Sequence, residues 1–157
     1  MREARFREGK PIGYGEVMSV TFSLHPQLEA DTTLVGDMPL TRVLLSTDAN
    51  YPWLILVPRL PGIVEIIDLE ENAQIQLTGE IARASAALKA VTSCDKLNVA
   101  AIGNVVPQLH VHVVARYRTD IAWPRPVWGM APAKPYDDEA RTRLVAKLRA
   151  AIEAGGR

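Results

Sequence analysis

Within residues 104–116, polar and apolar side chains alternate from Gln108 to Val113. This period of two is typical of a β-strand, in which successive side chains point to opposite faces. The polar face would carry Gln108, His110 and His112, and the apolar face would carry Leu109, Val111 and Val113. Burial of the three aliphatic side chains would contribute about 1.5–3 kcal/mol each, so the apolar face is expected to fix the register. The pattern therefore predicts a rigid strand that presents two imidazoles and an amide in a row.

Strand-like segments also occur at residues 32–35, 41–45, 53–57 and 97–102. The third of them, Trp53–Val57, is apolar throughout, which is typical of a central strand buried on both faces. The last would be joined to the histidine strand by a tight turn at Gly103-Asn104, because both residues tolerate positive φ. The order of the segments predicts an antiparallel meander, with Asn98 near the histidines.

Two amphipathic helices are predicted. The first is long, with Asp68 as its N-cap and Glu71 completing a capping box. Its apolar stripe consists of Leu77, Ile81, Ala84, Leu88 and Val91, and its solvent face would carry Glu80, Arg83 and Lys89. The second covers residues 137–154 and is ended by Gly155-Gly156; its stripe consists of Ala140, Leu144, Leu148 and Ile152.

The remaining segments are less regular. Residues 1–17 show no sustained period and are expected to form a flexible arm before a single domain over residues 18–157. His25 lies beside Pro26 in a short helix or turn and is interpreted as a surface or turn residue. Residues 123–129 predict a proline-stiffened loop, either a surface flap packed by its own tryptophans or a lid or dimer contact. Together the elements predict an α+β fold: a meander sheet, one long helix packed on it, and a C-terminal helix.

Composition limits the classes of function. With 18 Lys+Arg and 18 Asp+Glu among 157 residues, there is no net field to recruit nucleic acid or an anionic membrane. No apolar run approaches the roughly 20 residues of a membrane span. Cys94 is the single cysteine and cannot form an intrachain disulfide, which suits a reducing compartment. We therefore expect a cytoplasmic protein that binds neither nucleic acid nor membrane.

The His-x-His pair has three chemical interpretations. Two imidazoles on one face can bind a metal, but zinc requires three or four ligands and no further ones are identified. They can also form a structural polar ladder without chemistry. Third, a neutral imidazole can attack phosphorus and form a phosphoramidate that water then opens.

Residues 108–114 resemble the signature of the histidine triad family, His-φ-His-φ-His-φ-φ, where φ is hydrophobic. Residues 52–58 are similar to the Gly-His-x-Leu-Val-x-Pro strand of that family, and the predicted elements follow in its order. The resemblance covers roughly residues 20–130. Segments 96–98, 103–112 and 123–129 more narrowly resemble a bacterial branch often labelled diadenosine-tetraphosphate hydrolase-like.

The resemblance implies a homodimeric nucleotide hydrolase or nucleotidyl transferase that acts at the α-phosphate of a nucleoside phosphoanhydride or phosphoramidate. It implies that His110 is the nucleophile and that His112 bonds the phosphate and assists the leaving group. For a purine nucleotide it implies contacts from Asn98, Asn104 and Asp48, the last through the ribose hydroxyls. It implies no protein-bound metal or other cofactor, although a divalent cation could accompany a polyphosphate substrate.

Two positions depart from the family pattern. Gln108 replaces the first histidine of the triad; its amide can orient a neighbouring imidazole but cannot become cationic. Trp53 replaces the upstream histidine and is expected to be unable to set the tautomer or charge of the triad. These departures predict either slow turnover or a natural substrate that differs from that of members with the full triad. The alternatives are a nucleotide-binding module without turnover, or a metal-binding or structural strand.

Overall fold

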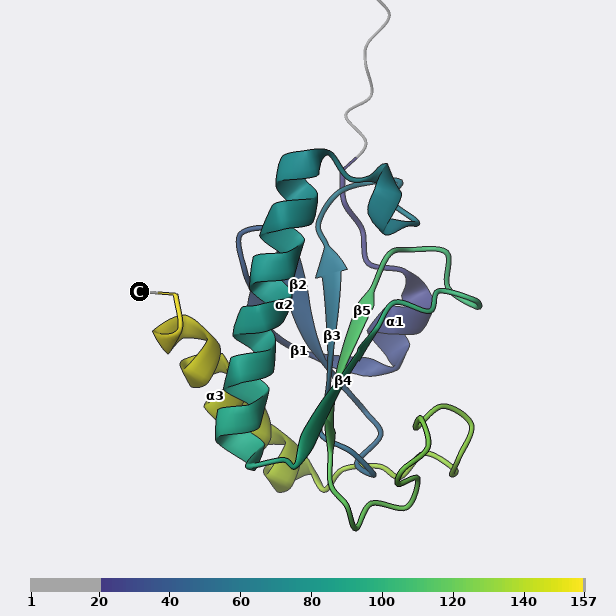
Figure 1. Ribbon diagram of the computed structural model, residues 1–157, viewed down its shortest axis with the longest axis vertical. Helices are drawn as coiled ribbons and strands as arrows, with labels where there is room; N and C mark the ends of the chain where they lie inside the picture. The colour runs from purple at the N-terminus through teal and green to yellow at the C-terminus, as the bar shows by residue number, and fades with distance from the viewer. Residues whose placement is uncertain (1–20, 157) are drawn as a thin grey trace, which may run out of the picture.

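The computed structural model describes residues 21–156, within which five strands form one antiparallel sheet (Figure 1). The strands are β1 Thr32–Asp37, β2 Thr41–Ser46, β3 Trp53–Pro58, β4 Lys96–Ala100 and β5 Val111–Arg116, in the spatial order β1-β2-β3-β5-β4. The helices are α1 Pro26–Ala30, α2 Glu71–Thr92 and α3 Asp138–Ala154, with a 3₁₀ turn, η1, at Ile66–Asp68. The predicted α+β fold is confirmed. The arm predicted at residues 1–17 lies outside the described residues.

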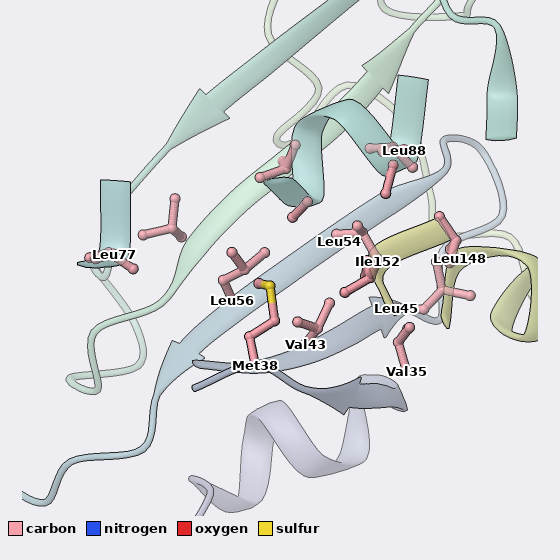
Figure 2. Close-up of a cluster of buried hydrophobic side chains, with 14 of the residues drawn as sticks. Val35, Met38, Val43, Leu45, Leu54, Leu56, Leu77, Leu88, Leu148 and Ile152 are labelled. Carbon is pink, nitrogen blue, oxygen red and sulfur yellow. The ribbon is translucent and has the colours of Figure 1, made fainter. Parts of the chain in front are cut away.

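β3 lies at the centre of the sheet, and residues 54–58 of it are buried, as its apolar sequence predicts. On one face, Leu54 and Leu56 pack beneath α2 and α3, which lie side by side (Figures 1 and 2). The predicted stripe of α2 is confirmed, with Leu77 and Leu88 buried in this core. On the opposite face, the short helix α1 packs against β2 and β3. Because α1 is short, part of this second face remains free for a cavity.

The alternation predicted for the histidine strand is confirmed. Leu109, Val111 and Val113 are buried in the core beneath α2. However, β5 begins only at Val111, and residues 101–110 form a loop. The tight turn predicted at Gly103-Asn104 is therefore wrong, although Gly103 has a φ of +63°. The connection is longer because the Leu109 N–H donates to the carbonyl of Ile63 instead of to a neighbouring strand.

The N-terminus of α2 also differs from the prediction. Asp68 ends η1, where its carboxylate accepts hydrogen bonds from the backbone N–H groups of Val64 and Glu65 at 3.1 and 2.8 Å. Glu70 is the N-cap of α2, which begins at Glu71. Asp68 therefore caps the turn before the helix and not the helix itself.

The prediction that Glu80 lies on the solvent face of α2 is wrong, because this residue is only 3% exposed. Its carboxylate accepts hydrogen bonds from the backbone N–H groups of Leu40 and Thr41, both at 2.8 Å, and from the Thr41 hydroxyl at 2.7 Å. Arg83, also predicted on the solvent face, donates a hydrogen bond to the Ile152 carbonyl of α3 at 2.7 Å. Lys89 is exposed as predicted. The polar side of α2 thus ties the helix to the start of β2 and to α3.

We expect Glu80→Gln to lower the free energy of unfolding by about 1–3 kcal/mol, because an amide nitrogen cannot accept a hydrogen bond and leaves buried donors unpaired. Urea titration measures the loss. Glu71→Gln, at an exposed position of the same helix, is the matched control. Equal stability of the two variants would contradict the role assigned to Glu80.

Candidate active site

A cavity of about 400 Å³ lies on the face of the sheet opposite α2 and α3. Volumes of this size are typical of small-molecule sites. Both histidines of the 104–116 segment contribute to its lining, together with α1, the 101–110 loop and two tryptophans. The lining residues are Gln27, Leu28, Asp31, Ser46, Trp53, Ile55, Ile102, Gly103, Asn104, Val105, Val106, His110, His112 and Trp128.

His110 is oriented by the main chain just before it. Its Nδ1 lies 2.6 Å from the carbonyl oxygen of Gln108. Because a carbonyl can only accept a hydrogen bond, Nδ1 must carry the proton, which leaves the lone pair on Nε2. His110 lines the cavity and is only 7% exposed. This is the tautomer that a nucleophilic imidazole requires.

His112 is held by an indole. The Trp53 Nε1–H donates to His112 Nδ1 at 3.0 Å. Because an indole N–H can only donate, His112 Nδ1 is the acceptor and Nε2 carries the proton of the neutral ring. The expectation that Trp53 cannot set a tautomer is therefore wrong: β3 brings its indole across to β5, where Ile55 stands opposite His112.

The pKa of His112 is lowered from its ordinary value of 6.5 to about 4. Burial is the main cause, and the nearby His110 adds to it. The His112 ring meets the edges of Trp53 and Trp128, with centroids 5.3 and 5.5 Å away, and His110 lies 4.8 Å away. His112 is therefore neutral at physiological pH, with its N–H on Nε2.

The side chain of Gln108 does not line the cavity. Its Oε1 accepts a hydrogen bond from the His25 N–H at 2.9 Å, and its Nε2 donates to the Ser23 carbonyl at 2.9 Å. The expectation that the amide orients an imidazole is corrected, since the carbonyl of Gln108 does so instead. His25 is the N-cap of α1, where its Nδ1 accepts from the Gln27 N–H, in keeping with its interpretation as a turn residue.

Asn98 and Asn104 occupy different places. Asn98 of β4 stands opposite Val114, on the same sheet face as His112, but its Oδ1 accepts a hydrogen bond from Arg116 at 2.6 Å. Arg116 is itself buried and paired with Asp120 at 2.7 Å. Asn98 lines a neighbouring hollow, whereas Asn104 lines the cavity, and its contact with a nucleotide stays a prediction.

Asp48 is not brought to the cavity. Its Oδ1 accepts hydrogen bonds from the backbone N–H groups of Asn50 and Lys134 at 3.0 and 3.1 Å. The short turn between β2 and β3 therefore directs this carboxylate toward the segment that leads into α3. Its geometry is that of a structural residue and does not match the predicted ribose contact.

The cavity also contains polar residues that sequence reasoning missed. Asp31 accepts a hydrogen bond from Gln27 Nε2 at 2.7 Å, and both line the cavity. Their spacing of four residues across the end of a helix is the sequence signal that predicts such a contact.

Trp128 lines the cavity against Trp53, with ring centroids 5.6 Å apart. The position of Trp128 therefore favours the interpretation that residues 123–129 form a lid. It argues against a surface flap packed only by its own tryptophans.

Within residues 21–156, no three His, Cys, Asp or Glu side chains gather in a way that could hold a metal ion. No helix in the described part of the chain is both long and apolar enough to cross a membrane.

Comparison with known proteins supports the resemblance. The family model of the HIT domain matches residues 27–119. A histidine triad protein from Bradyrhizobium japonicum is 55% identical, with 84% of this chain and 98% of that chain covered at a TM-score of 0.83. A histidine triad protein from Marinobacter aquaeolei VT8 is 46% identical, with 85% of this chain and 98% of that chain covered at a TM-score of 0.82. One from Sinorhizobium meliloti 1021 is 41% identical, with 83% of this chain and 96% of that chain covered at a TM-score of 0.81. No curated protein gives a significant match.

The lowered pKa of His112 predicts a pH-dependent stability. Its value is about 4 in the folded chain and near 6.5 when unfolded, so between these values the unfolded state binds the extra proton. Stability is therefore lost as pH falls through this window, by at most about 3 kcal/mol, and the loss levels off below about pH 4.

Urea titrations of the wild-type protein and of His112→Gln between about pH 6.5 and 4 measure this loss in the free energy of unfolding. Asp37 and Asp120, whose pKa values are lowered from 3.8, also lose a stabilising contribution on acidification, but this loss is the same in both proteins and cancels in the comparison. The wild-type protein should lose more stability on acidification than His112→Gln. Parallel curves for the two proteins would show that His112 is not held neutral by the fold.

Proposed function

The chain belongs to the HIT domain family, whose members generally act on nucleotides, and we propose that it is a nucleotide hydrolase or nucleotidyl transferase. Its reaction centre is the α-phosphate of a nucleoside phosphoanhydride or phosphoramidate. The observation that supports this proposal is the complementary pair of tautomers: His110 offers a lone pair on Nε2, and His112 offers an N–H on Nε2. Both rings line one cavity.

In the first step, His110 Nε2 attacks the α-phosphorus, and the bond between phosphorus and the leaving group breaks. The product is a nucleotidyl-imidazolium with a P–N bond. Its positive charge lies beside the Gln108 carbonyl, which already accepts from Nδ1 at 2.6 Å. A hydrogen bond from a cationic donor is stronger than one from a neutral donor, so this contact stabilises the charge as it forms.

In the second step, water attacks the phosphorus and the electron pair of the P–N bond returns to His110 Nε2. The proton lost by the water passes to solvent, so the nucleoside monophosphate is released and His110 is again neutral. His112 donates Nε2–H to a non-bridging oxygen of the phosphoryl group in both steps. Donors fixed in advance where negative charge develops are an effective source of catalysis. The bond from Trp53 fixes this donor before substrate binds.

The rest of the cavity suits a purine nucleoside. Leu28, Ile55 and Val106 form a buried apolar cluster at its wall, against which a base would pack. Asp31 and Gln27 provide acceptor and donor groups for ribose hydroxyls, the role first expected of Asp48. A divalent cation would accompany a polyphosphate substrate and would be held by its phosphates.

The homodimer implied by the family also belongs to this proposal. β4 is an edge strand with β5 as its neighbour, and 49% of Val99 on β4 is exposed. Pairing of two β4 strands would continue the sheet and cover this edge. Analytical ultracentrifugation tests the dimer, and a monomer at micromolar concentration would contradict it.

We expect diadenosine tetraphosphate to leave an AMP adduct on His110, detectable by mass spectrometry after an acid-free quench. His110→Ala should form no adduct and lose at least about 100-fold in turnover, because the nucleophile is gone. His25→Ser, which keeps a capping residue outside the cavity, is the control and should retain both. Adduct-free turnover that survives His110→Ala would disprove the covalent route.

A second candidate is a nucleotide-binding module. The side-chain amides of Gln108 and Asn98 favour this candidate, because both make hydrogen bonds to other groups of the protein and neither is directed into the cavity, where it could assist turnover. Calorimetry distinguishes it from the enzyme: AMP would bind the wild-type protein and His110→Ala equally, with neither adduct nor product.

A further inference from the structure

Trp53 can only donate in its hydrogen bond with His112. The indole N–H donates to His112 Nδ1 and has no lone pair that could accept a hydrogen bond from that nitrogen. A protonated His112 would carry N–H on both nitrogens, so its Nδ1–H would face the indole N–H. The contact that exists at 3.0 Å is therefore compatible with the neutral ring alone.

The indole is also fixed in place by packing. Its ring meets His112 edge-on at 5.3 Å and Trp128 at 5.6 Å, and it packs against both aromatic and aliphatic clusters of this sheet face. Of the titratable groups that share the cavity, His110 contacts His112, and Asp31 is paired with Gln27. The groups that β3 and the 123–129 segment present to His112 are Trp53 and Trp128, neither of which titrates.

We propose that Trp53 is a positioning residue that selects the leaving group: by holding His112 as the neutral Nε2–H donor, it restricts the enzyme to phosphoanhydrides. This rests on the proposed function. A neutral imidazole N–H can donate a hydrogen bond but cannot give up its proton at physiological pH. The leaving group must therefore depart as a stable anion.

The chemistry of the two substrate classes then separates them. In a phosphoanhydride, the electron pair of the breaking P–O bond leaves on a phosphate oxygen, which needs no proton. In a phosphoramidate, the pair leaves on nitrogen, which departs only when it is protonated. General acid catalysis of such a step contributes about 10²–10⁴-fold, and the Trp53–His112 arrangement withholds it.

The test compares two probes with the same AMP group, diadenosine tetraphosphate and adenosine 5′-phosphoramidate. The wild-type protein should prefer the anhydride by at least about 100-fold in kcat/KM. Trp53→His places an imidazole where the indole was, which allows a cationic His112, and should raise phosphoramidate turnover relative to anhydride turnover by about 10-fold or more near pH 6. Trp123→Phe, which changes an exposed tryptophan that does not line the cavity, should leave the ratio unchanged.

A readout independent of activity is the ¹⁵N spectrum of His112 in the free protein. The wild-type ring should show the Nε2–H tautomer, and Trp53→Phe, which removes the donor, should show a mixture with Nδ1–H. An Nδ1–H tautomer in the wild-type protein, or equal turnover of the two probes, overturns the inference. If neither probe forms an adduct, the proposed function fails and leaving-group selection fails with it, while the spectrum still shows whether Trp53 sets the tautomer.

Discussion

The site depends on one packing constraint, the burial beneath α2 of the apolar side chains of residues 109–113, which span the end of a loop and the start of β5. Leu109, Val111 and Val113 occupy the core, and this fixes His110 and His112 on the other side of the sheet. A shift by one residue would reverse the two faces, placing imidazoles in the core and aliphatic groups in the cavity. The positions of the reactive groups are thus set by side chains that never contact a ligand.

On that scaffold, two hydrogen bonds of opposite direction distinguish two chemically identical rings. The Gln108 carbonyl accepts from His110, and the Trp53 indole donates to His112. Each partner has a fixed polarity, so neither ring can exchange its tautomer without losing a bond. A carbonyl and an indole therefore leave one imidazole with a free lone pair on Nε2 and its neighbour with a free N–H on Nε2, in a chain where two positions of the family pattern are not histidine.

The sequence predicted the parts of the fold that follow from periodicity. The buried β3, the stripe of α2 and the two faces of β5 each involve residues that repeat at a regular spacing. It did not predict contacts that depend on how separate elements meet. Glu80 lies on the polar side of α2 by spacing, yet the start of β2 surrounds it with N–H donors. Trp53 and His112 are 59 residues apart, and only the β3–β5 register shows that their side chains meet.

The charge of the cavity lining indicates where catalysis would arise. Within the described residues, no lysine or arginine lines the cavity, so a phosphate there would meet N–H donors instead of fixed cations. In the proposed reaction, positive charge beside the phosphorus would appear only when His110 forms its bond and the Gln108 carbonyl, which lies 2.6 Å from Nδ1, accepts from an imidazolium. Stabilisation of this kind is stronger in the transition state than in the bound ground state, so it would accelerate the proposed reaction without tightening substrate binding. A cavity with few fixed charges is therefore compatible with turnover, provided that both rings are oriented before the substrate arrives.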